Sequence, residues 1–454
     1  MTRNCEVFAK CPTGALVFHP NPPFKSAVTE FGLFCGRDAY HATLVSTLQF
    51  AGVFLGTIIF GHIGDAVGRK PVGIAVSTTG MLVGVFTGFA PNWQWLLVGR
   101  LLTGLSIGGV LVSTFTHVIE LIPAEQRMLL RAVFSWGWGR MLMTFICFVL
   151  REWRRAMIAT TVIVCMPLTL LVTFILPESP RWLQSKGAAG VGRAHHTADH
   201  DETCQLEAAA ESSAKPESAS PQSSKVYSAA DLVRSGAELR RRTVVYCTMW
   251  FTASVGSFAI DLNSSRLPGD FFATQFIFSA LLIVAKLALF LVDSYIPQFR
   301  RRTLHQGPLS VVIIGFVTII VLQLNGVKEG YVVTALTQLG VIFMEYSWDA
   351  NYLCAAEGYP TPIRAIGVGV CSCTARIGGI LAPQLAFLST LWPPAVYVFA
   401  TALFGLDLTV SCCWLPETKG VDLPDTFFDQ QHENANENEL ILIQSNHNNE
   451  PVKT

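Results

Sequence analysis

The segment ELIPAEQR, residues 120–127, decides the fold, because the second half of the chain repeats it as EGYPTPIR, residues 357–364. Both copies share the pattern Glu-x-x-Pro-x-x-x-Arg. A second pair, LPES at residues 176–179 and LPET at residues 415–418, follows in the same order and at nearly the same separation. Repeats at a constant separation predict two parallel halves of similar structure.

The apolar runs of the chain place both halves in a membrane. Hydrophobic residues make up 51% of the sequence and charged residues 14%, whereas soluble domains carry about 25% charged residues. Many runs reach or approach the roughly 20 residues that cross a bilayer as a helix. Eleven spans are predicted, at about 41–61, 71–90, 93–118, 132–150, 156–176, 243–262, 270–293, 308–325, 331–353, 366–390 and 393–415. We therefore expect an all-α membrane protein of the major facilitator fold, with two pseudo-symmetric bundles of five and six helices.

Polar segments divide the chain further. The expected parts are an extracellular N-terminal segment (1–40), an N-terminal bundle (41–184), a flexible cytoplasmic linker (185–240), a C-terminal bundle (241–420) and a disordered tail (421–454). The linker is rich in Ala, Ser and Glu and has little apolar surface to bury. Positive loop residues gather on one side, which the positive-inside rule assigns to the cytoplasm. The N-terminus is therefore expected outside the cell and the C-terminus inside.

Several function classes find no support in the sequence. Basic and acidic residues both number 32, so the net charge indicates no nucleic-acid partner. The chain contains no phosphate-binding loop, nucleophile elbow or zinc-binding helix, and the spacing in HHTADHDETC (195–204) fits no metal site. We expect no enzyme activity, no cofactor and no metal, and we expect ion gradients or solute exchange to drive any transport.

Two cations stand inside predicted spans, Lys286 and Arg376. A charge near the bilayer centre costs at least a few kcal/mol, so such residues face a water-filled cavity or a partner. Arginine suits carboxylates because its planar fork binds two oxygens at once. One hypothesis is therefore a site for an organic anion. The alternative is that Asp349 or Glu345 pairs with one of the cations and merely ties helices together.

Other side chains fit an anion pocket. Trp348 and Tyr352 are four residues apart, so they share a helix face, and aromatic walls suit flat amphipathic solutes. Either ring could equally be packing or lipid-facing. Ser372 precedes Arg376 by about one turn and could donate a hydrogen bond to a substrate, or to its own helix.

Acidic and basic residues recur at the predicted cytoplasmic helix ends. GHIGDAVGRK (61–70) is a short charged turn, and VDSYIPQFRRR (292–302) is its weaker counterpart. The charged residues of the repeats predict ion pairs between the halves that open during transport. The alternative is exposed charges worth under about 1 kcal/mol each. The candidate gating residues are Asp65, Arg69, Glu120, Arg127, Glu178, Arg181, Glu357 and Arg364.

The order of several short motifs resembles that of the solute carrier 22 family of organic-ion transporters. The matching segments are VTEFGLFC (28–35), RLLTGLSIGG (100–109), PESPRWL (177–183), MWFTAS (249–254) and EGYPTPIRAIGVG (357–369), while GHIGDAVGRK (61–70) resembles the loop signature of major facilitators in general. The resemblance covers roughly residues 26–420. It implies a multi-pass plasma-membrane transporter that works by alternating access.

The resemblance also implies a substrate class. VAKLALFLVD (284–293) and TARIGGILAP (374–383) are similar to helices of the organic-anion branch, which carries a lysine where Lys286 stands and an arginine where Arg376 stands. The cation branch has an aspartate at the second position. The implied substrate is a small organic anion, with a dicarboxylate as an exchange partner. Phe148 matches a family aromatic near the outer end of a helix.

The sequence also departs from the family pattern. The family's first helix and most of its large extracellular loop are absent, so an N-terminally short member is expected. SVGSFAIDL replaces a tyrosine pair and offers Phe258 as a pocket residue, while the extra Arg140 could join the anion site or reach toward the membrane surface. These departures leave two alternatives open. One is a non-transporting or regulatory relative, and the other is a transporter of cations or zwitterions with Asp349 as the counter-charge.

Overall fold

A computed structural model describes most of the membrane part of the chain. The described residues are 24–33, 36–121, 135–179, 182–183, 232, 236–264, 270–295, 300–326, 330–360 and 363–418. Most of the expected N-terminal segment and linker, and the tail from residue 421, lie outside these ranges. Arg127 and Arg181 lie outside them too, and the side chain of Glu120 is not described. The chain divides into two compact units: unit 1 holds residues 1–226 and 275–283, and unit 2 holds residues 227–274 and 284–454.

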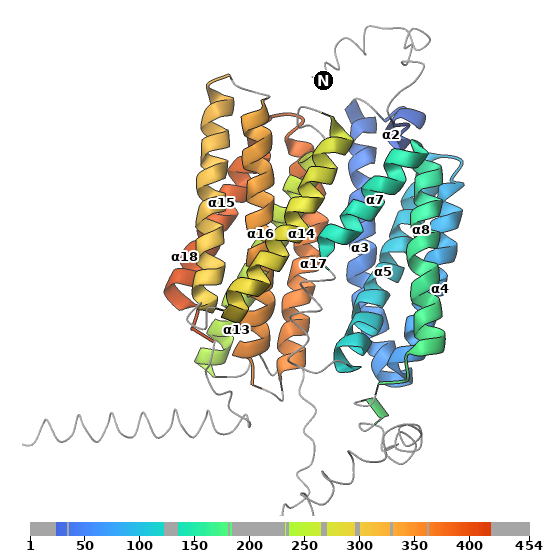
Figure 1. Cartoon of the computed structure of the whole chain (residues 1–454), viewed down its shortest axis with the longest axis horizontal. Helices are drawn as coiled ribbons and strands as arrows, with labels where there is room; N and C mark the ends of the chain where they lie inside the picture. The colour runs from blue at the N-terminus through green and yellow to red at the C-terminus, as the bar shows by residue number, and fades with distance from the viewer. Residues whose placement is uncertain are drawn as a thin grey trace, which may run out of the picture. The chain divides into compact units, whose positions relative to one another are not determined.

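Unit 1 is built from one short helix, α2, and a series of longer apolar helices joined by short connections (Figure 1). These helices are α2 (Ala27–Glu30), α3 (Gly36–Val67), α4 (Arg69–Gly88), α5 (Trp93–Leu121), α7 (Trp136–Leu150) and α8 (Trp153–Leu170), which continues as the π-helix η2 (Leu171–Ile175). Glycines bring α3 and α5 together. A Cβ on Gly52 would overlap the Leu101 carbonyl oxygen, and a Cβ on Gly104 would overlap that of Gln49. Backbone contact of this kind is how small residues pack membrane helices.

Unit 2 contains the remaining long helices. They are α13 (Ala237–Asn263), α14 (Phe271–Tyr295), α15 (Arg301–Leu324), α16 (Tyr331–Gly358), α17 (Arg364–Leu388) and α18 (Ala395–Trp414), with residues 275–283 of α14 assigned to unit 1. Tyr246, Met249 and Trp250 of α13 are fully buried in a cluster with residues of α16 and α17. α13 is therefore the central element of this unit.

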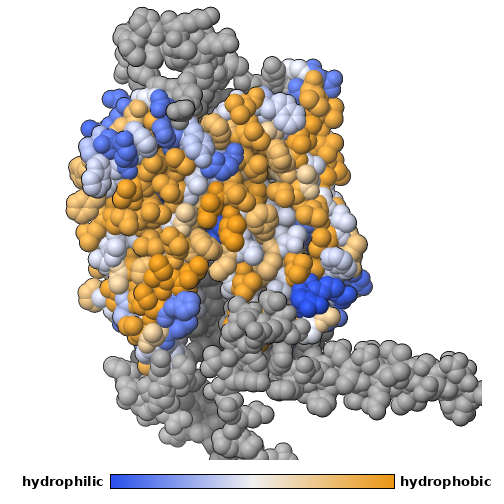
Figure 2. All heavy atoms as spheres, turned by 180° about the vertical axis from the view of Figure 1, so that it is seen from behind, coloured by the Kyte–Doolittle hydropathy of each residue, from blue (hydrophilic) through white to orange (hydrophobic). Residues whose placement is uncertain are grey.

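The helices have the length and surface of membrane spans. Within the described residues, nine helices are long and apolar enough to cross a bilayer. α7 is shorter, and α16 carries Glu345, Asp349 and Glu357. Figure 2 shows apolar side chains covering much of the visible face, with hydrophilic residues gathered toward its ends. Each of the eleven predicted spans corresponds to one helix, as expected for an all-α membrane protein.

The sequence repeats occupy equivalent positions in the two units. In unit 1, the Glu178 carboxylate accepts hydrogen bonds from the backbone N–H groups of Arg69 and Lys70, at 3.1 and 3.0 Å, where α4 begins. In unit 2, Glu417 accepts bonds from the N–H groups of Arg301 and Arg302, at 2.9 and 3.3 Å, where α15 begins. A carboxylate at a helix N-terminus satisfies free N–H groups and interacts favourably with the helix dipole. This cap explains why α15 begins at Arg301 and not near residue 308.

Candidate functional site

Lys286 lies inside unit 2 between two carboxylates. Its Nζ is 2.6 Å from Oδ2 of Asp349 and 3.3 Å from Oε2 of Glu345, and it also donates to the Glu345 carbonyl at 3.1 Å. The side chains of Lys286 and Asp349 are only 9% and 13% exposed. The lysine comes from α14 and both acids come from α16. This is the pairing that the alternative interpretation of the sequence expected, in which the cation ties helices together.

The charge of this cluster differs from that of a lone lysine. One ammonium and two ionised carboxylates sum to −1, so the cluster formed by Lys286, Glu345 and Asp349 does not present a surplus of positive charge. By formal charge, the cluster can attract a cation more readily than an anion. The binding of a substrate's anionic group by Lys286 therefore stays a prediction. It requires Asp349 or Glu345 to separate from the lysine first.

Arg376 has a different environment. It lies near the middle of α17 and is half-buried. No described carboxylate lies within ion-pair distance of its guanidinium, and its buried Nε has no hydrogen-bond partner among the described residues. The preceding residue is fixed to α13, because Ser254 Oγ donates to the Ala375 carbonyl at 2.5 Å. α17 therefore holds in place a guanidinium that lacks a protein counter-charge in the described residues.

The predicted aromatic residues gather around α13. The Trp348 indole N–H donates to Ser257 Oγ at 3.2 Å. The Trp250 ring lies edge-on to Trp348 and Tyr352, with ring centroids 5.9 and 4.4 Å away. Trp348 and Tyr352 are partly buried against the core of the unit. The three rings form one continuous aromatic wall, in which Trp250 was not foreseen from the sequence.

Two further predicted pocket residues lie on helices of unit 2. Phe258 on α13 and Ser372 on α17 are both half-buried. Ser372 precedes Arg376 on the same helix, as the sequence predicted.

Arg140 and Phe148 both belong to α7 of unit 1 and contact different residues of α14. Arg140 on α7 donates through Nε and Nη2 to Oε1 of Gln275, at 3.1 and 2.7 Å, and its guanidinium lies 4.5 Å from the ring centroid of Phe278. Phe148 packs edge-on against Phe276 at 6.2 Å and is 44% exposed. Arg140 thus has an amide oxygen and an aromatic ring among its neighbours, and both interact favourably with a guanidinium.

The candidate gating residues form ion pairs within each unit. In unit 1, Arg69 Nη2 is 2.7 Å from Oδ1 of Asp65. In unit 2, Glu357 pairs with Arg301 at 3.0 Å, and Arg301 also pairs with Asp293 at 2.8 Å. Arg364, which shares the repeat with Glu357, donates its Nε to the Tyr359 carbonyl at 3.3 Å.

The described contacts of Glu178 and Glu357 therefore stabilise each unit internally. Glu357 also accepts a hydrogen bond from Thr418 at 2.9 Å. Arg301 and Asp293 belong to the weaker repeat VDSYIPQFRRR, and that repeat was the signal that could have identified them as partners of Glu357. Whether any of these charges separates during transport stays a prediction.

A buried polar cluster in unit 2 was missed from the sequence. His305 Nε2 on α15 lies 3.4 Å from Oδ1 of Asp407 on α18, and the two side chains are 0% and 1% exposed. Thr252 on α13 donates to the other carboxylate oxygen at 2.9 Å. The sequence feature that could have identified this cluster is Asp407, the single acid in the apolar run ALFGLDLTVSCCW (402–414). Acids within spans are rare and almost always paired.

Comparison with known proteins agrees with this architecture. A family model described as "Sugar (and other) transporter" matches residues 21–426. An uncharacterized protein of Caenorhabditis elegans is 36% identical over 92% of this chain and 83% of its own length. A Xenopus laevis protein named "Solute carrier family 22 member 15-like" is 28% identical, over 91% and 83% of the two chains. The "Organic cation transporter protein" of Drosophila melanogaster is 29% identical, over 92% and 76%.

A solved structure extends the likeness to the fold. The proton:xylose symporter XylE of E. coli superimposes with a TM-score of 0.66, covering 87% of this chain and 91% of XylE, at 15% sequence identity. The identity is too low to carry substrate information, but the shared fold is that of a major facilitator. The chain therefore belongs to the sugar (and other) transporter family, and it is a multi-pass membrane transporter of the solute carrier 22 type.

Proposed function

We propose that this protein transports small amphipathic organic ions that carry a carboxylate or similar anionic group, and that Arg376 binds that group. The single observation that carries the proposal is a guanidinium in the middle of an apolar helix without a described counter-charge. Leaving such a charge uncompensated costs several kcal/mol, so a bound anion is the simplest compensation. The forked donors of arginine match the two oxygens of a carboxylate.

The aromatic wall supports an amphipathic substrate. Trp348 and Tyr352 are partly buried and pack against the fully buried Trp250 of α13, and Ser257 fixes the Trp348 indole. Rings held in this way bind a flat apolar body with little loss of side-chain entropy. Phe148, Phe258, Ser372 and Arg140 are further candidate contacts.

A zwitterion is a second candidate substrate, because the Lys286 cluster has a net charge of −1. A substrate ammonium group would be attracted to Asp349 and Glu345, while its carboxylate would bind Arg376. Relatives of this chain include proteins named for organic cations and for carnitine. The four charges of this set, Lys286, Arg376, Glu345 and Asp349, sum to zero, which matches a substrate that carries both signs.

Uptake measurements on cells that express the full chain test this proposal. We expect saturable uptake of anionic or zwitterionic dyes, a loss of at least tenfold in Arg376→Gln and partial recovery in Arg376→Lys. Arg155→Gln is the matched control, since Arg155 is 74% exposed and outside the site. Surface biotinylation corrects each value for expression. Unchanged uptake in Arg376→Gln would refute the site assignment.

The same assay separates the alternatives. Competition by a purely cationic dye, with none by an anionic one, would favour a cation transporter. Surface-expressed protein that moves no dye would favour a non-transporting or regulatory relative.

We further propose a plasma-membrane location, with the N-terminus outside and the C-terminus inside, and exchange against an intracellular dicarboxylate. Epitope tags at each end, stained with and without permeabilisation, test the orientation.

The charged helix ends are proposed to control alternating access. Asp65 with Arg69 in unit 1, and Glu357 with Arg301 in unit 2, are the pairs available for this role. Arg301→Gln should then change the rate of uptake more than substrate affinity, because gating affects the conformational step.

A further inference from the structure

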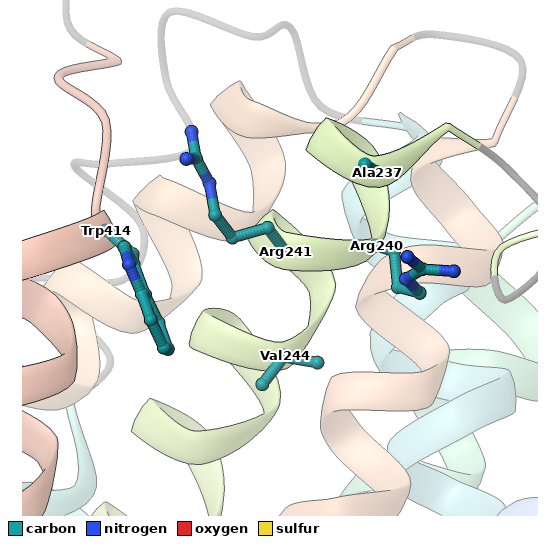
Figure 3. A pocket seen from close by; sticks show the side chains of 5 residues that line it. All are labelled: Ala237, Arg240, Arg241, Val244 and Trp414. Carbon is teal, nitrogen blue, oxygen red and sulfur yellow. The ribbon is translucent and has the colours of Figure 1, made fainter.

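A shallow pocket lies where α13 begins beside the end of α18, away from the candidate substrate site. Its volume is about 280 Å³, and it is lined by Ala237, Arg240, Arg241, Val244 and Trp414. Figure 3 shows Arg241 and Trp414 on one flank of α13, with Arg240 projecting from the other flank. All five residues belong to unit 2. The pocket thus combines two guanidinium groups with an indole and an aliphatic side chain.

The charge at this end of α13 is strongly positive. Arg240 and Arg241 are both exposed. Glu238 is the acid of this turn, and it is shared between Arg241, at 3.4 Å, and Arg242, at 2.9 Å. Three arginines and one glutamate leave a charge of +2 within five residues. Arg240 has no ion pair with a described carboxylate. The pocket therefore has positive charge available for an anion.

The apolar part of the pocket is exposed as well. Trp414 is the last residue of α18 and is 49% exposed, and Val244, one turn inward from Arg240 on α13, is 52% exposed. Both helices qualify as membrane spans by length and composition. Trp414 is therefore at the depth where bilayers meet water, which is where tryptophan is enriched in membrane proteins.

We propose that this pocket binds an anionic phospholipid of the adjoining leaflet. The lipid phosphate lies against Arg241, with Arg240 adding positive potential, and the first part of an acyl chain lies along Val244 and Trp414. Guanidinium groups bind phosphate oxygens through charge-assisted hydrogen bonds. Basic pockets beside membrane helices are suited to anionic lipid headgroups. A free phosphate ion would use the arginines but leave the exposed indole and valine without a role.

Native mass spectrometry of the purified full-length protein, titrated with palmitoyl-oleoyl phosphatidylserine, tests the proposal. We expect phosphatidylserine to bind more tightly than phosphatidylcholine with the same chains. The double substitution Arg240→Gln/Arg241→Gln should weaken the tightest phosphatidylserine site about thirtyfold, the factor that corresponds to about 1 kcal/mol per cation. Trp414→Ala should weaken the same site, and Lys25→Gln/Arg155→Gln, which removes two exposed cations of unit 1, should leave it unchanged.

The outcomes that overturn the proposal are specific. Equal binding of the two lipids, or wild-type binding by the Arg240/Arg241 double variant, would exclude a lipid headgroup site here. Displacement of the lipid by millimolar inorganic phosphate would show a simple anion site instead. Arg241→Lys provides a second test in case the double variant misfolds. It keeps the positive charge and loses only the bidentate geometry of the guanidinium, so phosphatidylserine binding should weaken a few-fold. The test measures lipid binding and not transport, so its result is independent of the proposed function.

Discussion

The cluster of Lys286, Asp349 and Glu345 makes a prediction about stability that can be developed in detail. At an effective dielectric constant of about 20, charges 2.6 and 3.3 Å apart attract by about 6 and 5 kcal/mol, respectively. Repulsion between the two acids and several kcal/mol of desolvation per ion offset most of this attraction. Removing only the lysine leaves two poorly solvated carboxylates. We therefore expect Lys286→Met to lower the free energy of unfolding by about 3–5 kcal/mol.

A double-mutant cycle isolates the pair. Asp349→Asn alone should also destabilise unit 2, whereas Lys286→Met/Asp349→Asn should cost much less than the sum of the two single changes. SDS-induced unfolding of the purified protein, followed by tryptophan fluorescence, measures the three free energies. We expect a coupling of at least about 2 kcal/mol, since contacting residues show coupling of this size. Additivity within about 0.5 kcal/mol would refute the reasoning that the pair is a single electrostatic unit.

The same variants distinguish the two roles of Lys286. If the lysine only ties α14 to α16, the Lys286→Met/Asp349→Asn protein should reach the surface and take up organic ions normally. If an acid releases Lys286 to bind the substrate's anionic group, the double variant should fold but lose uptake. Lys286→Arg, which keeps the charge, should retain part of the activity in either case.

Three further changes probe other parts of the chain. Asp407→Asn should retain the hydrogen bond from Thr252 but lose the carboxylate that faces the buried histidine, and we expect a loss of about 2–4 kcal/mol in SDS unfolding. Gly104→Ala should prevent α3 from packing on α5 and abolish surface expression, while Gly139→Ala, which meets nothing within 4 Å, should be tolerated. The hydrogen bond from Arg154 holds the pKa of Glu30 below its usual value. The stabilisation of α2 should therefore be present above the ordinary glutamate pKa and lost as the pH falls through the lowered value, and Glu30→Gln should remove this pH dependence of protease sensitivity near α2.

The sequence predicted the helices because their physical cause is local. Each span is an apolar run of sufficient length, and the bilayer leaves the backbone few alternatives to a helix. The span at 331–353 was predicted despite Glu345 and Asp349, since the apolar residues around them outnumber the charges. The ends were less certain, because the start of α15 depends on Glu417, a residue more than a hundred positions away.

The pairing of charges could not be predicted in the same way. The sequence shows Lys286 and Arg376 as equivalent cations in apolar runs, and it does not give the rotation of one helix against another. That rotation places Lys286 against α16 and leaves Arg376 without a described acid. The repeats similarly predicted that Glu357 pairs with a residue of the other half, whereas its described ion pair is with Arg301 of its own unit, at the start of α15.

Lys286 has carboxylate partners and Arg376 has none among the described residues, and this difference leads to a last prediction, about Arg376. If a missing counter-charge makes this residue unfavourable in the unliganded protein, an apolar side chain of similar length should be better tolerated there. We expect Arg376→Met to raise the free energy of unfolding by about 1–3 kcal/mol, whereas Lys286→Met lowers it. The same Arg376→Met protein should lose uptake, since sites kept for function are commonly sites where stability is sacrificed. Binding of the right anion should stabilise the wild-type protein in proportion to ligand concentration but leave the variant unaffected. A variant that is less stable than the wild type and equally active would show that Arg376 serves the packing of α17 and not the substrate.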